Sequence, residues 1–547
     1  MGLKRSGGLC ALALAAAFGA APKKSAEPQL SSIYPAAAQR ESAFEAEIRG
    51  AELDGARAVV FQDTGLEARV LSAGADLAHV RIAVAPDARQ GRHEFRVVTP
   101  RGVTNKLALD VVAEPVVDEK QAGETLRRFP LVINGRLAQP GESDAYWIEV
   151  AANQTLTFEA GAAEAKFDPE LVLYEPSGSW FDPHRLNRIG FNDEPLYFPG
   201  LSTGARLVQH FARGGRYCVQ VQGFSGQGGP DFAYHLRISP GVTPAPVLHP
   251  PLKPAWEERQ FTRPLERDRL ADLARRGGTP GNAAPPEVFH AAAEDAPEIP
   301  WMAAPGMVEG RITHPGEAHA IRLRVNQAED LAIEIETPGA TLPRFNPVVR
   351  LMEPGGREMA TDVYTKLNNN GLYMMKMIEA KTTVSLRAPG EYRMQIRDIT
   401  TDCAGDDFLY RVLVRPQIPH VGKVEVEEDH VNLEAGASRP VNVRIDREEG
   451  FSDYVAMAVE GLPPGVTAVP ALENPPEKPP LPNGGKLERY VAREQSLAVM
   501  LVAAPDAPLT TVPARARVVV RVVHGGQLQP PIAEEEIPVM VIARRPS

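Results

Sequence analysis

Short runs of alternating hydrophobic and polar residues, separated by Pro, Gly and Asn, follow one another along most of this chain. Residues 146–150 and 155–159 are two such runs, and residues 320–325 and 331–335 are two more. A period of two residues between turn-forming residues is typical of antiparallel β-strands with one buried face. The sequence therefore predicts an all-β protein made of tandem β-sandwiches.

One set of these runs occurs twice. Its motifs recur in the same order at offsets of 175 to 178 residues. Near-constant offsets indicate a duplicated module with small loop insertions. The matching motifs are Arg136-Leu137 and Arg311-Ile312, Pro140-Gly141-Glu142 and Pro315-Gly316-Glu317, Phe167-Asp168-Pro169 and Phe345-Asn346-Pro347, Glu175-Pro176 and Glu353-Pro354, Tyr217 and Tyr392, and Phe232 and Phe408.

Both copies resemble the bacterial pre-peptidase C-terminal domain, a jelly-roll-like sandwich found beside secreted proteases and in other exported proteins. The resemblance implies two such domains, over residues 130–240 and 308–416. The second copy departs from the family pattern where an Asn-Asp-Asp-like loop is usual, because it has Asp362 and residues 368–370 there. The resemblance is carried by residues 141–144, 167–174, 191–194, 215–217 and 232–234 in the first copy, and by residues 345–347, 390–392 and 407–410 in the second.

The repeats are flanked by two further modules. Residues 27–113 hold short strands at turn-bounded intervals, which is typical of an immunoglobulin-like sandwich. Ile33-Tyr34-Pro35, Leu53-Asp54-Gly55-Ala56 and Val84-Ala85-Pro86 resemble the IPT/TIG family of extracellular immunoglobulin-like domains. Residues 417–547, through Gly461-Leu462-Pro463-Pro464-Gly465-Val466, resemble the immunoglobulin-like domains that close such multidomain proteins.

The N-terminus has the order of a secretory signal peptide over residues 1–26. Lys4-Arg5 precedes an apolar stretch over residues 9–18, and small residues follow it. No later run approaches the roughly 20 apolar residues that a membrane-spanning helix needs. We therefore expect an exported protein, periplasmic or extracellular, with no transmembrane segment.

Two segments are expected to connect the modules. Residues 114–129 form a connector, and residues 241–307 form a Pro-rich linker. Within the linker, Leu265, Leu270, Leu273 and Ala274 form a narrow apolar stripe among charged residues. This stripe predicts one short helix that docks on a neighbouring sandwich, and the alternative is a solvated, partly flexible spacer.

Charge and motif content exclude several functions. The chain has 59 Lys and Arg against 70 Asp and Glu, a formal net charge of -11, and no long basic run, so nucleic acid is not an expected partner. It lacks a His-Glu-x-x-His zinc motif and a phosphate-binding loop. One Gly-x-Ser-x-Gly match occurs at residues 200–204, but it lies in a repeat of predicted strands, whereas a nucleophile elbow leads into a helix. The sequence therefore predicts a non-catalytic protein.

Calcium is the one cofactor that the residue types suggest. The first repeat has Asp144, Asp168, Asn192, Asp193 and Glu194 at predicted strand ends, and oxygen ligands of this kind suit a hard cation. Members of the resembling family sometimes bind calcium. The alternative is that these residues initiate turns by bonding to their own backbone. The second repeat offers a weaker set: Asn346, Asp362, Asp406 and Asp407.

Aromatic side chains are the other candidates for a ligand site, because stacked rings on a sandwich hold many polysaccharides. Trp180 and Phe181 follow Gly178 in a predicted loop and are the surface candidates, with ordinary packing as the alternative. Trp147 lies within an alternating strand, and we expect it in the core.

These modules predict a rod-like string of sandwiches that binds an extracellular or cell-envelope polymer or protein. Tandem modules can convert weak contacts into avidity. The alternative is an accessory subunit of a secreted peptidase or other hydrolase carried on a separate chain. A third hypothesis, an enzyme whose site is assembled between modules, has no motif behind it.

Overall fold

The computed structural model describes residues 27–162, 167–176, 186–193, 204–243, 265, 268–279, 281–337, 345, 347–367, 374–378, 381–398, 404–406, 408–473 and 493–544. The predicted signal peptide lies outside these residues, as do Glu194, Trp180 and Phe181. Within them, strands predominate and α1 (Arg269–Arg276) is the one α-helix, so the predicted all-β class is confirmed. No helix in this part of the chain is long and apolar enough to cross a membrane.

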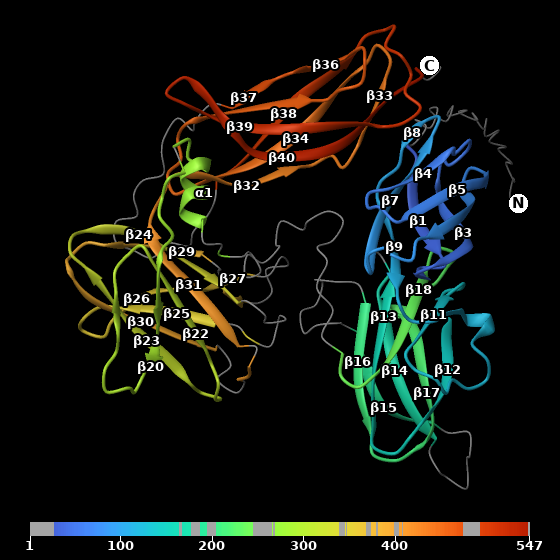
Figure 1. Ribbon diagram of the computed structural model, residues 1–547, viewed down its shortest axis with the longest axis horizontal. Helices are drawn as coiled ribbons and strands as arrows, with labels where there is room; N and C mark the ends of the chain where they lie inside the picture. The colour runs from blue at the N-terminus through green and yellow to red at the C-terminus, as the bar shows by residue number, and fades with distance from the viewer. Residues whose placement is uncertain are drawn as a thin grey trace, which may run out of the picture.

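The described residues form four β-sandwiches (Figure 1). We call them the N-terminal module (residues 27–112), the first repeat (116–243), the second repeat (287–416) and the C-terminal module (420–542). Each one buries its own cluster of aliphatic and aromatic side chains between two sheets. Four separate cores are what the length of the chain leads us to expect.

The N-terminal module has strand orders β1-β3-β6-β5 and β2-β9-β7-β4, and β8 pairs with β7. Its resemblance to the IPT/TIG family stays a prediction, because many families share a two-sheet sandwich. The strands are β1 (Gln29–Tyr34), β2 (Ala37–Gln39), β3 (Ser42–Ala51), β4 (Ala58–Phe61), β5 (Leu66–Ala73), β6 (Leu77–Val84), β7 (Gly91–Thr99), β8 (Gly102–Val103) and β9 (Leu107–Val112).

The first repeat has strand orders β10-β11-β18-β13-β16 and β12-β17-β14-β15. A short 3-10 helix, η1 (Glu119–Gln121), follows its first strand, and a second, η2 (Phe224–Gly226), follows β17. The strands are β10 (Val116–Asp118), β11 (Leu131–Arg136), β12 (Ser143–Val150), β13 (Gln154–Ala162), β14 (Pro169–Pro176), β15 (Leu186–Asn192), β16 (Gly204–Phe211), β17 (Gly215–Gly223) and β18 (Ala233–Pro240).

The second repeat has the same topology with β20 added at one edge, in the orders β19-β22-β31-β24-β29 and β20-β23-β30-β25-β26. In addition, β21 pairs with β23, and β27 and β28 form a separate hairpin. The strands are β19 (Glu287–His290), β20 (Ala292–Ala293), β21 (Trp301–Met302), β22 (Gly306–Arg311), β23 (Ala318–Val325), β24 (Glu329–Glu336), β25 (Pro347–Met352), β26 (Glu358–Thr361), β27 (Val363–Leu367), β28 (Met374–Ile378), β29 (Lys381–Leu386), β30 (Gly390–Asp398) and β31 (Leu409–Pro416).

Each repeat starts with a strand that the sequence did not indicate. β10 pairs in parallel with β11, and β19 pairs in parallel with β22 in the same way. Residues 287–302, which the sequence analysis assigned to the linker, thus belong to the sheets of the second repeat through β19, β20 and β21.

A glycine faces a tyrosine at the same place in both repeats. Gly135 pairs with Tyr234 across β11 and β18, and Gly310 pairs with Tyr410 across β22 and β31. A Cβ on Gly135 would lie 2.3 Å from the Tyr234 hydroxyl, and one on Gly310 would lie 2.2 Å from the Tyr410 hydroxyl. Both tyrosine rings are buried, so only glycine leaves room for them.

The C-terminal module has strand orders β32-β34-β38-β36 and β33-β40-β39-β35-β37. Its core is rich in valine, which suits a pleated, buried surface. The strands are β32 (His420–Val426), β33 (Val431–Glu434), β34 (Ser438–Glu448), β35 (Tyr454–Glu460), β36 (Val466–Val469), β37 (Ala471–Glu473), β38 (Arg493–Ala503), β39 (Ala514–His524) and β40 (Gln527–Ile542).

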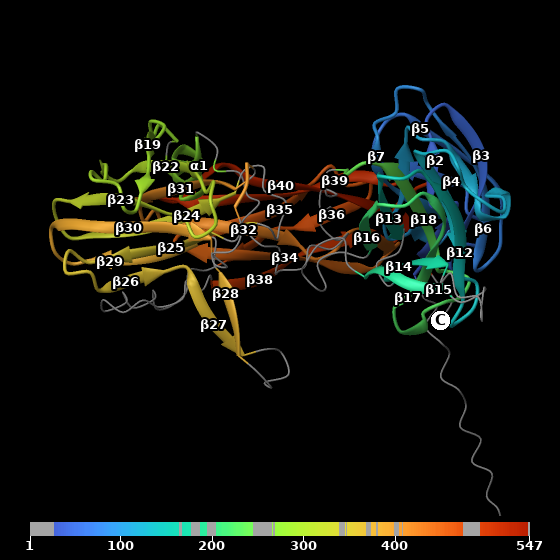
Figure 2. The same ribbon diagram turned by 90° about the horizontal axis from the view of Figure 1, so that it is seen from below.

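The modules form an arch, so the expectation of a rod-like string in chain order is wrong. The N-terminal module lies between the first repeat and the C-terminal module, and the second repeat lies at the far end of the C-terminal module (Figures 1 and 2). Val98 and Val103 of the N-terminal module pack against Met540 and Ile542 of the C-terminal module. The first and last modules therefore meet, although more than 300 residues separate Val103 from Asn432, which faces it.

Two buried asparagines fasten the N-terminal module on its two sides, and we call them the asparagine clamps. Asn134 of the first repeat accepts a hydrogen bond from the Ala37 N–H (2.8 Å) and donates one to the Ala37 carbonyl (2.9 Å). Asn432 of the C-terminal module does the same to Val103, at 2.8 Å and 2.9 Å. Each side-chain amide thus replaces the strand partner that one backbone residue would otherwise lack.

Helix α1 docks at the junction of the second repeat and the C-terminal module, as its apolar stripe predicted. Leu265 and Leu270 pack with Met307 and Leu413 of the second repeat. Leu273 is fully buried. On the other side of the helix, Arg276 donates to the Gly422 carbonyl (2.8 Å) of the C-terminal module. The docked-helix interpretation is therefore confirmed over the solvated spacer.

Candidate functional site

The predicted calcium residues of the first repeat do not all lie together. Asp168 precedes β14 and Asp193 follows β15, and the two strands are neighbours. Burial raises the pKa of the Asp168 carboxyl, and the charges of Asp193 and Glu170 raise it further. The Asp168 Oδ1 atom is buried and has no hydrogen-bond partner within the described chain. Asn192 donates to the Arg206 carbonyl at 2.6 Å. Asp168 and Asp193 thus form the part of the predicted set that comes together.

Asp144 lies in a different cluster, near the N-terminal module. Its Oδ2 atom accepts a hydrogen bond of 2.6 Å from the Tyr234 hydroxyl, which also bonds Tyr146 at 2.6 Å. Burial raises the pKa of the nearby Glu119 to about 7, and the charges of Asp144 and Asp118 contribute. The Asp144 side chain is thus directed toward Tyr234, and it is not among the groups that act on the Asp168 carboxyl.

The second repeat holds its acidic residues differently. Asp362 lies in the position of Asn192, because its backbone N–H bonds to Val349, the counterpart of Leu171. Burial raises the pKa of Asp362 to about 8, and its Oδ2 atom, like Oδ1 of Asp168, is buried without a hydrogen-bond partner in the described chain. Asp406 is exposed and pairs with Arg311, 3.4 Å away. Asn346 and Asp407 lie outside the described residues.

An aromatic surface covers the outer face of the β12-β17-β14-β15 sheet. Trp147 and Tyr174 both pair with Cys218, so the three residues lie in one row across three strands. Phe191 belongs to the next row, beside Val172, and is 43% exposed. The guanidinium of Arg216 lies 4.3 Å from the Trp147 ring centre. The expectation that Trp147 is a core residue is therefore wrong.

Alternation along β12 explains the position of Trp147. Its neighbours Tyr146 and Ile148 point into the core, so the residue between them must point outward. The outward-pointing residues of the neighbouring strand β17 include two amides. Gln220 donates a hydrogen bond to Ser143 Oγ (2.5 Å), and Gln222 donates one to Glu170 (2.6 Å). The face therefore combines aromatic rings with amide groups.

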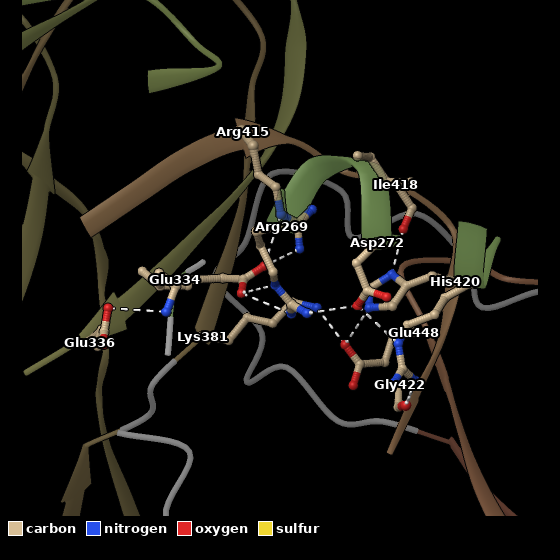
Figure 3. A network of polar contacts seen from close by, with 12 residues as sticks. Arg269, Asp272, Glu334, Glu336, Lys381, Arg415, Ile418, His420, Gly422 and Glu448 are labelled. Atoms are coloured by element: carbon tan, nitrogen blue, oxygen red, sulfur yellow. Dashed lines mark hydrogen bonds and ion pairs between the residues drawn. The ribbon is translucent and has the colours of Figure 1, made fainter. Parts of the chain in front are cut away.

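A second polar cluster joins the second repeat, α1 and the C-terminal module (Figure 3). One oxygen of Glu334 accepts from Arg415 (2.8 Å) and the other from Arg269 (3.0 Å). Burial opposes ionisation of Glu334, but the charges of Arg415 and Arg269 outweigh it and lower its pKa to about 2. The cluster therefore holds its charges while buried.

The same cluster continues into the C-terminal module. Arg415 donates to Glu449 (2.7 Å), and Lys381 pairs with Glu449 and, at 2.5 Å, with Glu448. His420, Glu448 and Glu449 are close enough to hold a metal ion together. The Lys381 ammonium already pairs with both carboxylates, so the cluster is an ionic junction between modules and not a metal site.

A histidine lies where the start of the described chain meets the C-terminal module. The His430 ring is 2.6 Å from Asp429 Oδ1 and 3.5 Å from Glu27 Oε2. Contact with His430 and with Arg439 lowers the pKa of Glu27 to about 2, against the effect of burial. Burial opposes protonation of His430, but its bonds to Asp429 and Glu27 outweigh that effect and raise its pKa. Arg96 also pairs with Asp429, at 3.3 Å.

This contact predicts a pH-dependent stability. Glu27 has a lowered pKa, so its contribution is present above about pH 4.5 and disappears as the pH falls toward 2. His430 has a raised pKa, so its contribution is present below about pH 6.5 and disappears as the pH rises through the folded value. We expect the wild-type free energy of unfolding to fall between pH 6 and 8 more steeply than that of His430→Gln. Urea unfolding across this range checks it, and parallel pH profiles would contradict it.

The fold defines a multidomain all-β protein of four sandwiches, two of which are copies of one module. No family model matches the chain, and no curated protein matches it. Among solved structures, it is similar to the pre-peptidase C-terminal domain of a Bacillus anthracis collagenase, with 16% identity over 23% of this chain and 98% of that chain and a TM-score of 0.17.

Two other solved structures are similar in the same limited way. PliG of Aeromonas hydrophila, a periplasmic inhibitor of g-type lysozyme, shares 16% identity over 24% of this chain and 100% of that chain, with a TM-score of 0.16. The tandem CBM22 domains of Paenibacillus barcinonensis Xyn10C share 10% identity over 69% of this chain and 98% of that chain, with a TM-score of 0.13. These scores are too low to support any argument about ligands.

Proposed function

We propose that this protein is a non-catalytic, exported binding protein that holds an extracellular or cell-envelope polysaccharide. The observation that carries the proposal is the row formed by Trp147, Cys218 and Tyr174 on the outer face of the first repeat. Trp147 and Tyr174 lie two strand spacings apart, roughly 10 Å. Two rings at this separation can stack on separate sugar rings of one chain, and the neighbouring amides can bond its hydroxyl groups.

The arch supports this proposal because it joins the two repeats through contacts with the other two modules. Each repeat is held to its neighbouring module by a buried polar contact, Asn134 with Ala37 on one side and Arg415 with Glu449 on the other. Binding surfaces held in fixed positions lose little freedom on contact with a long polymer, so weak contacts add up. Export is supported by the signal-peptide order of the first 26 residues.

Calcium at Asp168 and Asp193 is part of the same proposal. The unpaired Asp168 oxygen and the mutual repulsion of the nearby carboxylates are features that a bound cation would relieve. Such an ion would fix the start of β14 next to the end of β15, and Phe191 lies on β15 at the edge of the aromatic surface.

The test is co-sedimentation of the chain from Glu27 onward with insoluble peptidoglycan, chitin, cellulose and collagen, with calcium and with chelator. We expect saturable retention on one polysaccharide and at least a tenfold loss of affinity in Trp147→Ala, because one stacked ring is removed. The control is Tyr454→Ala, an exposed aromatic of the C-terminal module, which should leave retention unchanged.

Each other outcome has a defined meaning. Retention on a polysaccharide that Trp147→Ala does not weaken would exclude the aromatic surface as the site. Retention on collagen alone would replace the polysaccharide by a protein ligand. Loss of retention in chelator and in Asp193→Asn, but not in Asp144→Asn, would support calcium at Asp168 and Asp193, and retention that chelator does not change would contradict it.

A further inference from the structure

The second repeat presents the corresponding sheet face with a different composition. Duplication places β23, β30 and β25 where the first repeat has β12, β17 and β14. The first repeat has aromatic rings and amides on this face, whereas the second has arginines in adjacent rows: Arg322 faces Arg393, Arg350 faces Gln395, and Arg397 faces Val348. We call this set, with Arg324, the arginine face.

The arginine face carries an excess of positive charge in an acidic protein. Three carboxylates lie against it, and they hold the guanidinium groups in place. Arg324 donates to Glu391 (2.9 Å), Arg393 pairs with Glu294 (3.3 Å), and Arg350 pairs with Glu358 (3.4 Å). Five arginines against three glutamates leave two positive charges, while the whole chain carries -11.

The guanidinium groups keep donors to spare. Arg397 has no carboxylate partner among the residues that the structure describes, and its Nε atom, like that of Arg393, is buried, so a ligand would have to use the terminal guanidinium nitrogens. A guanidinium has five N–H donors, and the contacts above use only some of them. The Arg350 and Arg393 side chains are 38% and 40% exposed, so a ligand can reach them.

An aromatic ring borders the arginine face. Trp301 on β21 pairs with Arg322, and its ring is stacked by the Arg324 guanidinium at 4.4 Å. Trp301 itself is open to solvent, with 48% of the residue exposed. A flat ring beside fixed guanidinium groups matches a sugar ring that bears a carboxylate, because the ring can stack and the carboxylate can accept two parallel hydrogen bonds.

We propose that the arginine face binds an acidic polysaccharide whose sugar rings carry carboxylates. This inference rests on the proposed function and gives the second repeat a ligand class of its own. The arginine face has two positive charges in excess, spread over β23, β30 and β25. A polymer with one carboxylate on each sugar ring can place successive carboxylates against these charges. Duplex DNA fits less well, because it carries one phosphate charge per about 1.7 Å of helix axis and would be repelled by the acidic remainder of the chain.

The test uses the chain from Glu27 onward in affinity electrophoresis with polygalacturonate and with its fully methyl-esterified form, which keeps the sugar rings and removes the charge. We expect retardation by polygalacturonate only, weakened by salt. The double variant Arg350→Gln/Arg393→Gln should lose at least tenfold in affinity. The control is Arg515→Gln/Arg517→Gln, which removes two exposed arginines from the C-terminal module and should bind as the wild type does.

Several results would overturn the inference. These are equal retardation by the methyl ester, an unchanged Arg350→Gln/Arg393→Gln variant, or equal retardation by single-stranded DNA. If the double variant still sediments with the polysaccharide that requires Trp147, the proposed function stands whatever happens at the arginine face. If Trp147→Ala and the arginine variants all bind as the wild type does, both proposals fail together. Circular dichroism and urea unfolding of each variant establish that it is folded.

Discussion

Replacing Arg415 by methionine should lower the free energy of unfolding by about 3–5 kcal/mol, because it leaves two buried carboxylates without their main partner. The Arg415 side chain has no exposed area and pairs with Glu334 and Glu449, which lie in different modules. Urea unfolding, followed by circular dichroism, measures the loss. The second repeat and the C-terminal module should then unfold in separate transitions, since the junction that couples them is broken.

Arg411→Met is the matched control, since Arg411 lies on the same strand but is 40% exposed. It pairs with Glu309 and, at 3.5 Å, with Glu336, which keeps its hydrogen bond from the Leu265 N–H in the variant. Exposed pairs of this kind contribute about 0–1 kcal/mol. Equal effects of Arg411→Met and Arg415→Met would show that the ionic junction is not what couples the two modules.

Replacing Asn432 by leucine should open the arch. The variant leaves the N–H and the carbonyl of Val103 without partners in a buried position, at a cost of about 1–3 kcal/mol for each group. This cost is avoided if the N-terminal and C-terminal modules separate, because water can then bond to the N–H and the carbonyl of Val103. We therefore expect a larger radius of gyration by small-angle X-ray scattering, together with faster proteolysis between the modules.

The control for this prediction is Asn442→Leu. Asn442 bonds Glu428 inside the C-terminal module, at 2.7 Å, so its loss should lower stability without changing the shape of the molecule. An unchanged radius of gyration in Asn432→Leu would mean that the apolar contact of Val98 and Val103 with Met540 and Ile542 holds the arch closed without the amide.

The duplication and the strands could be predicted because they leave periodic signals over many residues. The two copies share Gly135 and Gly310 for a steric reason that recurs whenever the fold does. The outward direction of Trp147 was also available in the sequence, because Tyr146, Ile148 and Val150 already occupy the inward phase of the strand. That signal was outweighed by the general preference of tryptophan for the interior.

The remaining features depend on too few residues to leave a pattern. β10 and β19 are three and four residues long, so their alternation is too short to recognise. The arch depends on single amides, and nothing local distinguishes Asn432 from an asparagine in a turn. Asp144 bonds to Tyr234, which lies 90 residues further along the chain, and that contact requires the three-dimensional pairing.

The first asparagine clamp also carries a chemical risk that the second does not share. Asn134 is followed by Gly135, and an asparagine before glycine loses its amide readily by attack of the next backbone nitrogen when the chain is flexible. Gly135 cannot be replaced by a larger residue that would slow this deamidation, because Tyr234 occupies the space that a Cβ would need. Folding protects the pair, since β11 holds it extended and Asn134 is 2% exposed. Chains that stay unfolded would thus be deamidated at Asn134. The resulting aspartate could no longer donate a hydrogen bond to the Ala37 carbonyl.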